Sequence, residues 1–381
     1  MGSLLSHQPL KALGYLGFAL FVTPCFLLVN SSRFLFSSLR QDPAWGMKTA
    51  LMCAYVRLIT KFASLVRDQP YEQAKAATFK ERCVKIEPSN PKHFIGSVAE
   101  GSVKPKTTTG VWFPNLPHTA KPDEKVAIHY PGGAFILAFG VEVVGALMAD
   151  NLVGKLGADK MLYAQYRLAR DEESRFPAAV QDAVTFYSYV LSLGFKPENI
   201  IVSGDSAGGN VALALLRYLE TKKTDLPLPG AVITWSPWVA VPSDAGPKFD
   251  AQPNSHKDIL SGAILQWGAD SYRPGSTLDE EVEAMVNPLH HPFKTRVPIF
   301  LHAGSNEGFC PTVKEFSQEM ATLNGQERTK YHETPLAPHD IFLTHPAVGM
   351  GEQKNQAIEI ARSFLEKRRR GVEQPPPEDD L

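Results

Sequence analysis

From residue 82 onward, short apolar runs alternate with longer segments whose apolar positions recur every three or four residues. Short runs rich in β-branched and aromatic residues are typical of buried strands, and the longer period is typical of amphipathic helices. The predicted strands cover residues 83–87, 110–113, 125–130, 161–166, 200–203, 231–235, 297–302 and 328–333. The predicted helices cover residues 178–193, the segment after residue 206, and residues 257–270, 312–323 and 348–370. This alternation predicts a mostly parallel sheet with helices on both faces.

The first 66 residues differ from this pattern. Residues 12–29 form an uncharged apolar run between Lys11 and Arg33, which is just long enough to cross a bilayer as a helix. Three interpretations stay open: a membrane anchor, a buried helix or lid element, and a cleaved signal peptide. Pro24 interrupts the run, and no clean small-residue cleavage site follows it. If the run is a single-pass anchor, the excess of basic residues after it places the main domain in the cytosol. Without an anchor, we expect a cytoplasmic protein.

Residues 44–66 predict a second, amphipathic helix, which either packs over the main body as part of a lid or lies on a membrane surface. We therefore divide the chain into three parts. Residues 1–75 hold the apolar segment and the lid helix, and residues 76–370 form the main domain, with a lid insertion at about residues 239–288. Residues 371–381 form a proline-rich, acidic tail that is predicted to be disordered.

Composition narrows the function classes. The chain has 381 residues, of which 44% are hydrophobic and 21% are charged, so it can bury a large core. Because the formal net charge is only −1, we predict no nucleic-acid partner. The 4 cysteines are scattered without metal-ligand spacing, which favours free thiols and predicts no metal site. The sequence leaves the oligomeric state open.

The segment from Gly204 to Gly208 (Gly-Asp-Ser-Ala-Gly) lies between a predicted strand and a predicted helix, with Ser206 at its centre. This G-x-S-x-G pattern is typical of a sharp turn that projects a serine hydroxyl clear of the backbone. Strand and helix come so close at such a turn that side chains at Gly204 and Gly208 would collide. Ser206 is therefore the predicted nucleophile, and the alternative is a serine that caps a helix after a buried strand.

A serine nucleophile needs a histidine to accept its proton and a carboxylate to orient that histidine. Among the 11 histidines, His339 follows the last predicted strand and precedes the final helix, on the sheet edge expected to carry Ser206. Glu307 lies in the loop after the preceding strand, which gives the chain order serine, acid, histidine. We predict His339 as the base and Glu307 as the acid, with Asp340 as the alternative acid.

Gly132, Gly133 and Ala134 follow a predicted strand that ends at the same sheet edge. Glycines let backbone amides turn toward a ligand without side-chain obstruction. Together with the amide of Ala207, at the start of the helix after Ser206, they predict an oxyanion hole. Such a hole is a set of N–H donors for the negative charge that forms on a carbonyl oxygen under attack. The alternative is an ordinary glycine turn after a strand.

Six short motifs, in this order, make the chain resemble the hormone-sensitive-lipase-like branch of the α/β-hydrolases, also called the fold-3 group. They cover residues 131–135, 166–169, 176–179, 204–210, 304–307 and 338–342. The resemblance implies an α/β-hydrolase fold, with a helical lid built from the N-terminal residues and the insertion before Pro288. It also implies a carboxylic-ester hydrolase that needs no cofactor and acts on short- to medium-chain or bulky small-molecule esters.

Three residues depart from the family pattern. Pro131 stands where the family has a histidine, so the bonds that brace the glycine loop must differ. Ala134 replaces a third glycine, and its methyl group narrows the site. Glu307 stands where aspartate is commoner, and it keeps the charge with a longer reach. The motif from Pro131 to Ala134 is similar to fungal members, some of which tailor secondary metabolites.

The residues therefore predict a serine carboxylic-ester hydrolase that acts on a small-molecule ester through an acyl-enzyme intermediate. Two alternatives stay open: a tailoring hydrolase or lyase of a secondary-metabolite pathway, and a non-hydrolytic, ligand-binding member of the same fold. Non-hydrolytic members typically lose the base or the nucleophile. The presence of Ser206, Glu307 and His339 therefore favours the hydrolase.

Overall fold

The computed structural model describes residues 4–67, 69, 80–88, 90–99, 101–117, 119–222, 224–275 and 278–373. Its centre is an 8-stranded sheet with the order β1-β2-β4-β3-β5-β6-β7-β8. From β4 to β8 the neighbouring strands are parallel, whereas β2 pairs antiparallel with both β1 and β4. The strands are β1 Cys83–Ile86, β2 Thr108–Phe113, β3 Val126–Tyr130, β4 Lys160–Gln165, β5 Ile200–Asp205, β6 Ala231–Trp235, β7 Ile299–Gly304 and β8 Thr329–Thr334. The predicted mostly parallel sheet is confirmed.

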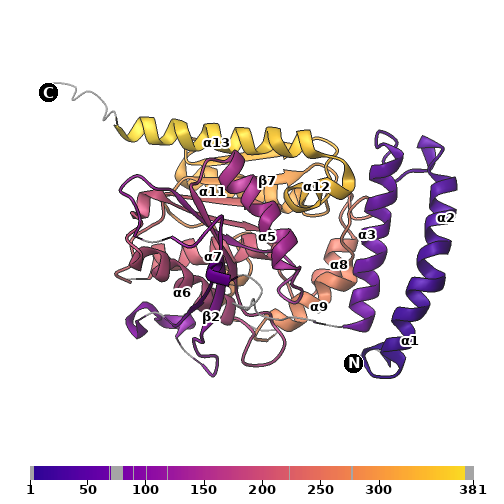
Figure 1. Cartoon of the computed structure of the whole chain (residues 1–381), viewed down its shortest axis with the longest axis horizontal. Helices are drawn as coiled ribbons and strands as arrows, with labels where there is room; N and C mark the ends of the chain where they lie inside the picture. Colours follow the sequence, from indigo (N-terminus) through magenta and orange to yellow (C-terminus); the bar gives the residue numbers. More distant parts are fainter. Residues whose placement is uncertain are drawn as a thin grey trace.

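Helices cover both faces of this sheet (Figure 1). On one face, α6, α7 and α11 bury apolar side chains in the larger core, and on the other, α5 and α13 pack over a second core. The helices of the main domain are α5 Val141–Ala149, α6 Ala178–Ser192, α7 Ser206–Thr221, α8 Ala245–Asp250, α9 Gly262–Tyr272, α10 Glu280–Val286, α11 Cys310–Asn324, α12 Ile341–Val348 and α13 Gly351–Glu373. Because both faces are covered, β3 and β5 are buried along their whole length and carry apolar runs instead of an alternating pattern.

The insertion after β6 contains three helices, α8, α9 and α10, where the sequence predicted a single one at residues 257–270. The helix in that region, α9, begins only at Gly262, whose amide donates to Asp250 Oδ1 at 3.1 Å. The sequence did not predict the short α8, because it contains a glycine and a proline, which lower helix propensity. The helices α8 and α9 lie between the sheet and α3 (Figure 1), whereas α10 packs on α7.

The N-terminal segment forms a helical hairpin, whose first helix consists of α1 Leu10–Gly17, a π-helical turn at Phe18–Val22, and α2 Thr23–Arg33. The second helix, α3, covers Met47–Val66. Pro24 does not end the first helix, because its missing N–H falls in the first turn of α2, directly after the π-helical turn. Aromatic side chains pack between the two helices. Phe18 stacks on Phe62 with ring centroids 4.1 Å apart, and the ring centroids of Phe26 and Tyr55 are 6.2 Å apart.

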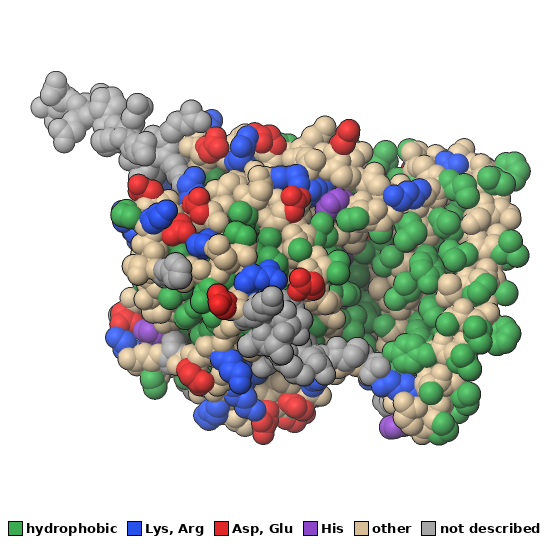
Figure 2. Space-filling view, in the orientation of Figure 1, with side chains coloured by type: hydrophobic (Ala, Val, Ile, Leu, Met, Phe, Trp, Pro, Cys, Tyr) green, Lys and Arg blue, Asp and Glu red, His purple; other side chains and the backbone are tan. Residues whose placement is uncertain are grey.

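Leu10–Arg33 and α3 are the two helices of the described chain that are long and apolar enough to cross a membrane. The most apolar window of Leu10–Arg33 has a mean hydropathy of 2.1 and none of it is buried, which excludes the interpretation as a buried helix. Apolar side chains dominate the hairpin surface, and few charges interrupt them (Figure 2). The α3 helix packs on α9 and α12, and thereby fixes the hairpin to the main domain.

The C-terminal helix α13 continues to Glu373, a little beyond the predicted domain boundary at residue 370. From residue 374 on, the tail that was predicted to be disordered lies outside the described residues. Residues 68 and 70–79, between α3 and β1, also lie outside them.

Candidate active site

Ser206 lies at a sharp turn between the end of β5 and the start of α7. Its φ is +50°, in the left-handed region that non-glycine residues seldom adopt. The turn brings the two elements into contact through their backbones. A Cβ on Gly204 would lie 2.2 Å from the Gly208 carbonyl oxygen, and a Cβ on Gly208 would lie 1.9 Å from that of Tyr130. Both glycines are therefore required by backbone packing, and the strained turn projects the Ser206 hydroxyl toward the neighbouring loops.

The fold brings together the three residues that the sequence selected. His339 Nε2 lies 3.0 Å from Ser206 Oγ, and His339 Nδ1 lies 3.2 Å from Glu307 Oε2. The three side chains come from loops after β5, β7 and β8, at the carboxyl edge of the parallel strands. Glu307 is fully buried, and Ser206 and His339 are 7% and 3% exposed. This arrangement lets the imidazole accept the serine proton while the carboxylate orients the ring.

Three buried carboxylates set the proton affinity of His339. Burial acts to lower the pKa of His339, but the hydrogen bond and charge of Glu307, followed by the charges of Asp258 and Asp205, raise it above its usual value. The charged form of this imidazole is therefore stabilised by its surroundings.

The loop after β3 faces the turn that carries Ser206. Ala134 and Phe135 have φ values of +52° and +63°, so this loop is held in a strained conformation beside the nucleophile. Within the described part of the chain, the amides of Gly133 and Ala134 donate to no backbone or side-chain acceptor. The Ala207 amide lies in the first turn of α7, where helix amides lack an intrahelical acceptor. These three amides fit the predicted donor set.

Gly132 does not belong to this set of oxyanion donors. Its amide donates to Asp205 Oδ2 at 2.9 Å in a buried hydrogen bond, so it is not free to bind an oxyanion. A Cβ at this position would lie 2.3 Å from the same oxygen, which explains why glycine is needed there. We therefore correct the prediction for Gly132: it anchors the loop to the residue that precedes the nucleophile. The sequence could not reveal this, because the bond joins residues 73 positions apart.

Asp340, the alternative acid, does not contact the His339 ring through its carboxylate in any described hydrogen bond. Its Oδ1 caps α12 by accepting from Leu343 N at 3.3 Å, and its own N–H donates to Ser236 Oγ at 3.0 Å. With a φ of +53°, it forms the tight corner between His339 and α12. The structure therefore favours Glu307 as the acid.

The sequence missed Asp258, which lies in the insertion and is 1% exposed. Its Oδ2 accepts from the amide of Gly308, the residue after Glu307, at 2.6 Å. It also missed the role of Asp205, whose Oδ1 lies 3.0 Å from His129 Nε2 while Oδ2 holds Gly132. Asp205 could have been noticed from its place beside Ser206. No sequence pattern singles out Asp258, because only the fold of the insertion brings it beside the acid loop.

A cavity of about 440 Å³ with mostly apolar and aromatic walls lies close to the site, although its described lining includes none of Ser206, Glu307 and His339. Trp238 lines it and donates its backbone N–H to the Ser206 carbonyl at 2.9 Å. Phe309 also lines it, with its ring edge-on to His339 and 5.1 Å away between centroids. Phe249 and Leu265, from α8 and α9, form part of its outer wall. The insertion therefore forms a cavity whose lining residues Trp238 and Phe309 contact Ser206 and His339.

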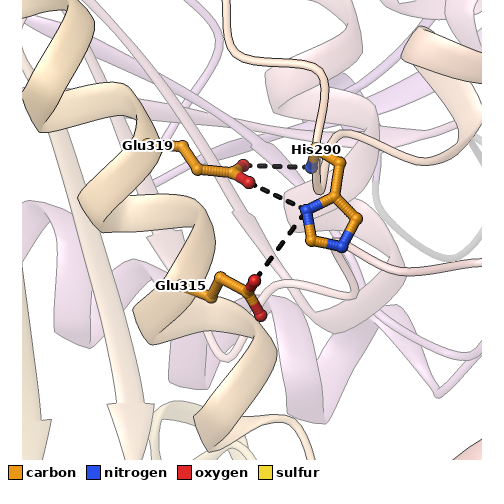
Figure 3. A group of neighbouring side chains, drawn as sticks. All are labelled: His290, Glu315 and Glu319. Atoms are coloured by element: carbon orange, nitrogen blue, oxygen red, sulfur yellow. Dashed lines mark hydrogen bonds and ion pairs between the residues drawn. The ribbon is translucent and has the colours of Figure 1, made fainter.

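One cluster of the described residues places three possible metal ligands within 4.8 Å of one another: His290, Glu315 and Glu319. Figure 3 shows that both Glu319 oxygens already accept from His290, at 3.0 Å from its backbone N and 2.9 Å from its Nδ1. Two ligand groups of the cluster are exposed. These hydrogen bonds fasten the segment after α10 to α11, and they give no reason to place a metal there.

Comparison with known families identifies the chain. The model of the fold-3 family, described as alpha/beta hydrolase fold, matches residues 127–343, which include Ser206, Glu307 and His339. The chain belongs to the α/β-hydrolase fold-3 family. The fold expected from the sequence motifs is confirmed. Relatives named acetyl-hydrolase and carboxylesterase identify the chain as a carboxylesterase-like hydrolase.

Among the relatives of this fold-3 hydrolase is an acetyl-hydrolase of Streptomyces hygroscopicus, which is 29% identical over 246 residues, or 65% of this chain and 77% of that protein. An esterase of Acinetobacter venetianus is 29% identical over 201 residues, or 51% of this chain and 61% of that protein. The crystal structure of an esterase from the bacterial hormone-sensitive lipase (HSL) family superposes with a TM-score of 0.59 at 19% identity, over 85% of this chain and 99% of that one. At this identity the structural similarity is one of fold.

Proposed function

We propose that this chain is a serine carboxylic-ester hydrolase that forms an acyl-enzyme on Ser206. The observation that carries the proposal is the unbroken relay of contacts from Ser206 Oγ through His339 to Glu307. Ser206 Oγ attacks the ester carbonyl carbon while His339 Nε2 takes the hydroxyl proton. The amides of Gly133, Ala134 and Ala207 bind the oxyanion. His339 then gives its proton to the leaving alcohol, and a water molecule, activated by His339, releases the acid and frees Ser206.

The substrate that we propose is a small-molecule ester with a short acyl group. The aromatic cavity of about 440 Å³ is lined by Trp238 and Phe309, which contact Ser206 and His339, and it supports a compact apolar group on one side of the ester bond. The name of the Streptomyces hygroscopicus relative, acetyl-hydrolase, is consistent with a small acyl group. The complete relay disfavours a non-hydrolytic binding role. A tailoring role in secondary metabolism and a fungal-type origin stay predictions from the motif at Pro131.

The test is hydrolysis of p-nitrophenyl acetate and butyrate by the purified protein, together with labelling by a fluorophosphonate probe. We expect turnover of both esters and a single labelled peptide that contains Ser206, because the probe reacts only with an activated serine. Saturating p-nitrophenyl butyrate should slow the labelling. A protein that binds these esters without turnover and remains unlabelled would support the ligand-binding alternative instead.

We further propose that the hairpin attaches the enzyme to a membrane surface. The helix Leu10–Arg33 is ~36 Å long at 1.5 Å per residue and carries exposed leucines and phenylalanines on its outer face. However, it packs along α3, which bears Lys48, Arg57 and Lys61 and is fixed to the main domain. A helix held in this way cannot cross a bilayer without drawing α3 and the domain into the hydrocarbon. Attachment along the surface is therefore favoured over a single pass.

This prediction is tested with sealed phosphatidylcholine vesicles. We expect the protein to float with the vesicles and Leu20→Asp/Phe21→Asp to remain soluble, because these side chains are 57% and 68% exposed on the hairpin. Val143→Asp is the matched control, since Val143 is 76% exposed on α5, which is not part of the hairpin. The position of the N-terminus relative to the vesicle membrane is measured with the variant His7→Cys/Cys25→Ser, in which the exposed Cys25 thiol is removed. An impermeant maleimide added outside should label Cys at position 7 if the helix lies on the surface, whereas protection of this thiol would indicate a single pass.

A further inference from the structure

The turn between α2 and α3, residues 34–46, reaches into the catalytic end of the main domain. Asp42 is 8% exposed and Trp45 is 2% exposed, although both belong to a connection between two helices whose outer surface is open. Phe34 and Trp45 share a small core with Ala337 and Ile341, which flank His339 in the chain. The turn is therefore packed against the loop that carries His339, the predicted base.

Asp42 holds the loop of the acid. Its Oδ2 accepts from Asn306 Nδ2 at 2.9 Å and from Lys257 Nζ at 3.0 Å, and Asn306 directly precedes Glu307. Its Oδ1 accepts from the Ala44 amide at 2.9 Å, so both oxygens are used. Burial acts to raise the pKa of Asp42, but the bonds from Ala44, Lys257 and Asn306 lower it below its usual value. The side chain is thus a charged, fully bonded anchor for Asn306.

Trp45 holds the loop of the base. Its Nε1–H donates to the carbonyl oxygen of Leu336 at 2.6 Å, three residues before His339. Leu336 has a φ of +59°, so the carbonyl is presented by a strained corner that its surroundings must maintain. The Leu336 amide donates in turn to Ser305 Oγ at 2.7 Å.

The two loops are also bonded to each other. Besides the bond from Leu336 to Ser305, the Asn306 amide donates to the Ala337 carbonyl at 2.9 Å. The acid and base loops are thus bonded into one unit. The turn binds this unit through one hydrogen bond to each loop, from Asn306 to Asp42 and from Trp45 to Leu336. A shift of either loop changes the contact between His339 Nδ1 and Glu307 Oε2, which is already 3.2 Å long.

We propose that Asp42 and Trp45 are positioning residues, which keep Glu307 and His339 in register for the transfer of the Ser206 proton. The proposal rests on the serine-hydrolase function proposed above. It gives the N-terminal hairpin a second role. The segment that carries the exposed apolar helix Leu10–Arg33 also holds the loops of Glu307 and His339 in place. An α/β core without residues 34–46 would keep Ser206 and lose the contacts that fix its partners. Small displacements of catalytic groups can cost up to about 10²-fold in rate.

The test compares Asp42→Asn and Trp45→Phe with Thr49→Val. Thr49 is the matched control, because its Oγ1 also ties α3 to the main domain, but through the carbonyl of Val348 at 2.9 Å, remote from both loops. With p-nitrophenyl butyrate we expect kcat to fall about 10-fold in Asp42→Asn and Trp45→Phe, with KM changed less than about threefold. Thr49→Val should keep both constants.

Two further measurements separate positioning from general loss of stability. A weaker contact with Glu307 should lower the pKa of His339, which is observed as a shift of its ¹³Cε1 resonance titration to lower pH in the Asp42→Asn protein. The exchange Asp42→Asn/Asn306→Asp should restore most of kcat, because Lys257 Nζ lies 3.4 Å from Asn306 Oδ1 and can pair with a carboxylate there.

Unchanged kcat and an unchanged His339 titration in folded Asp42→Asn and Trp45→Phe proteins would overturn the positioning role. So would an equal loss of kcat in Thr49→Val, since it would trace the effect to hairpin docking in general. The NMR titration keeps this inference separate from the proposed function. If the wild-type protein hydrolyses no ester, the serine-hydrolase proposal fails, while the effect of Asp42 on His339 is still measured.

Discussion

Replacing Ser206 with alanine should lower kcat/KM for p-nitrophenyl butyrate by at least about 10⁴-fold and abolish labelling by a fluorophosphonate. The hydroxyl is the group that attacks the ester, and the methyl group of alanine cannot replace it. Ser206 is only 7% exposed and occupies a turn that the alanine backbone must also adopt at a φ of +50°, so binding and folding should change little. The expected result is therefore a fall in kcat with a nearly unchanged KM.

The matched control is Ser188→Ala on α6, where the hydroxyl is 3.4 Å from His93 Nδ1 and makes no described hydrogen bond with the triad. It should retain wild-type kinetics and labelling. Residual turnover by Ser206→Ala within tenfold of wild type, in a preparation free of contaminating esterase, would exclude Ser206 as the nucleophile. Another residue or a water molecule would then have to perform the attack.

Replacing Glu307 with glutamine should lower kcat by about 10³–10⁴-fold, because the amide can hold the imidazole in the wrong tautomer and cannot stabilise its charged form. The pH profile should change as well. Glu307 raises the pKa of His339, and the base must be neutral to accept a proton, so wild-type kcat/KM should rise with pH through an apparent pKa above 6.5. Without the Glu307 charge the pKa falls, and the rise should move to lower pH.

Steady-state rates between pH 4 and 9 measure both effects. Glu333→Gln is the matched control, because Glu333 on β8 accepts from Tyr331 Oη at 3.1 Å and has no described contact with His339. Asp258→Asn discriminates between Glu307 and Asp258 as the carboxylate that orients the ring. If Asp258 were the residue that orients His339, Glu307→Gln would retain kcat within about threefold and Asp258→Asn would lose it.

A site residue could be predicted from the sequence when its interactions involve residues nearby in the chain, and not when its partners are distant. Ser206 was predictable because its constraints are local: the strained turn needs Gly204 and Gly208 at fixed offsets, since any Cβ there meets backbone atoms. His339 and Glu307 were selected from their places after successive strands, because parallel strands present their carboxyl ends at one edge. The same rule placed the loop with Gly133 and Ala134 beside them.

Where the partners are distant in the chain, the sequence was silent or misleading. Gly132 looked like one more oxyanion donor, yet its amide is used by Asp205, 73 residues away. The contact between Asp42 and Asn306 spans 264 residues, and that between Trp45 and Leu336 spans 291. No local pattern marks such pairs, because each side chain alone is compatible with an ordinary surface loop.

By itself, the sequence determined the order of the strands, the sharp turn at Ser206, the chain order of the predicted triad residues and the apolar character of residues 12–29. These properties depend on periodicity and on steric requirements within a few residues. The tertiary structure decided which amides are free, which carboxylates surround His339, and how the apolar helix is carried along α3. Those properties depend on burial and on hydrogen bonds between distant segments, and they come into being only when the hairpin, the insertion and the sheet pack together.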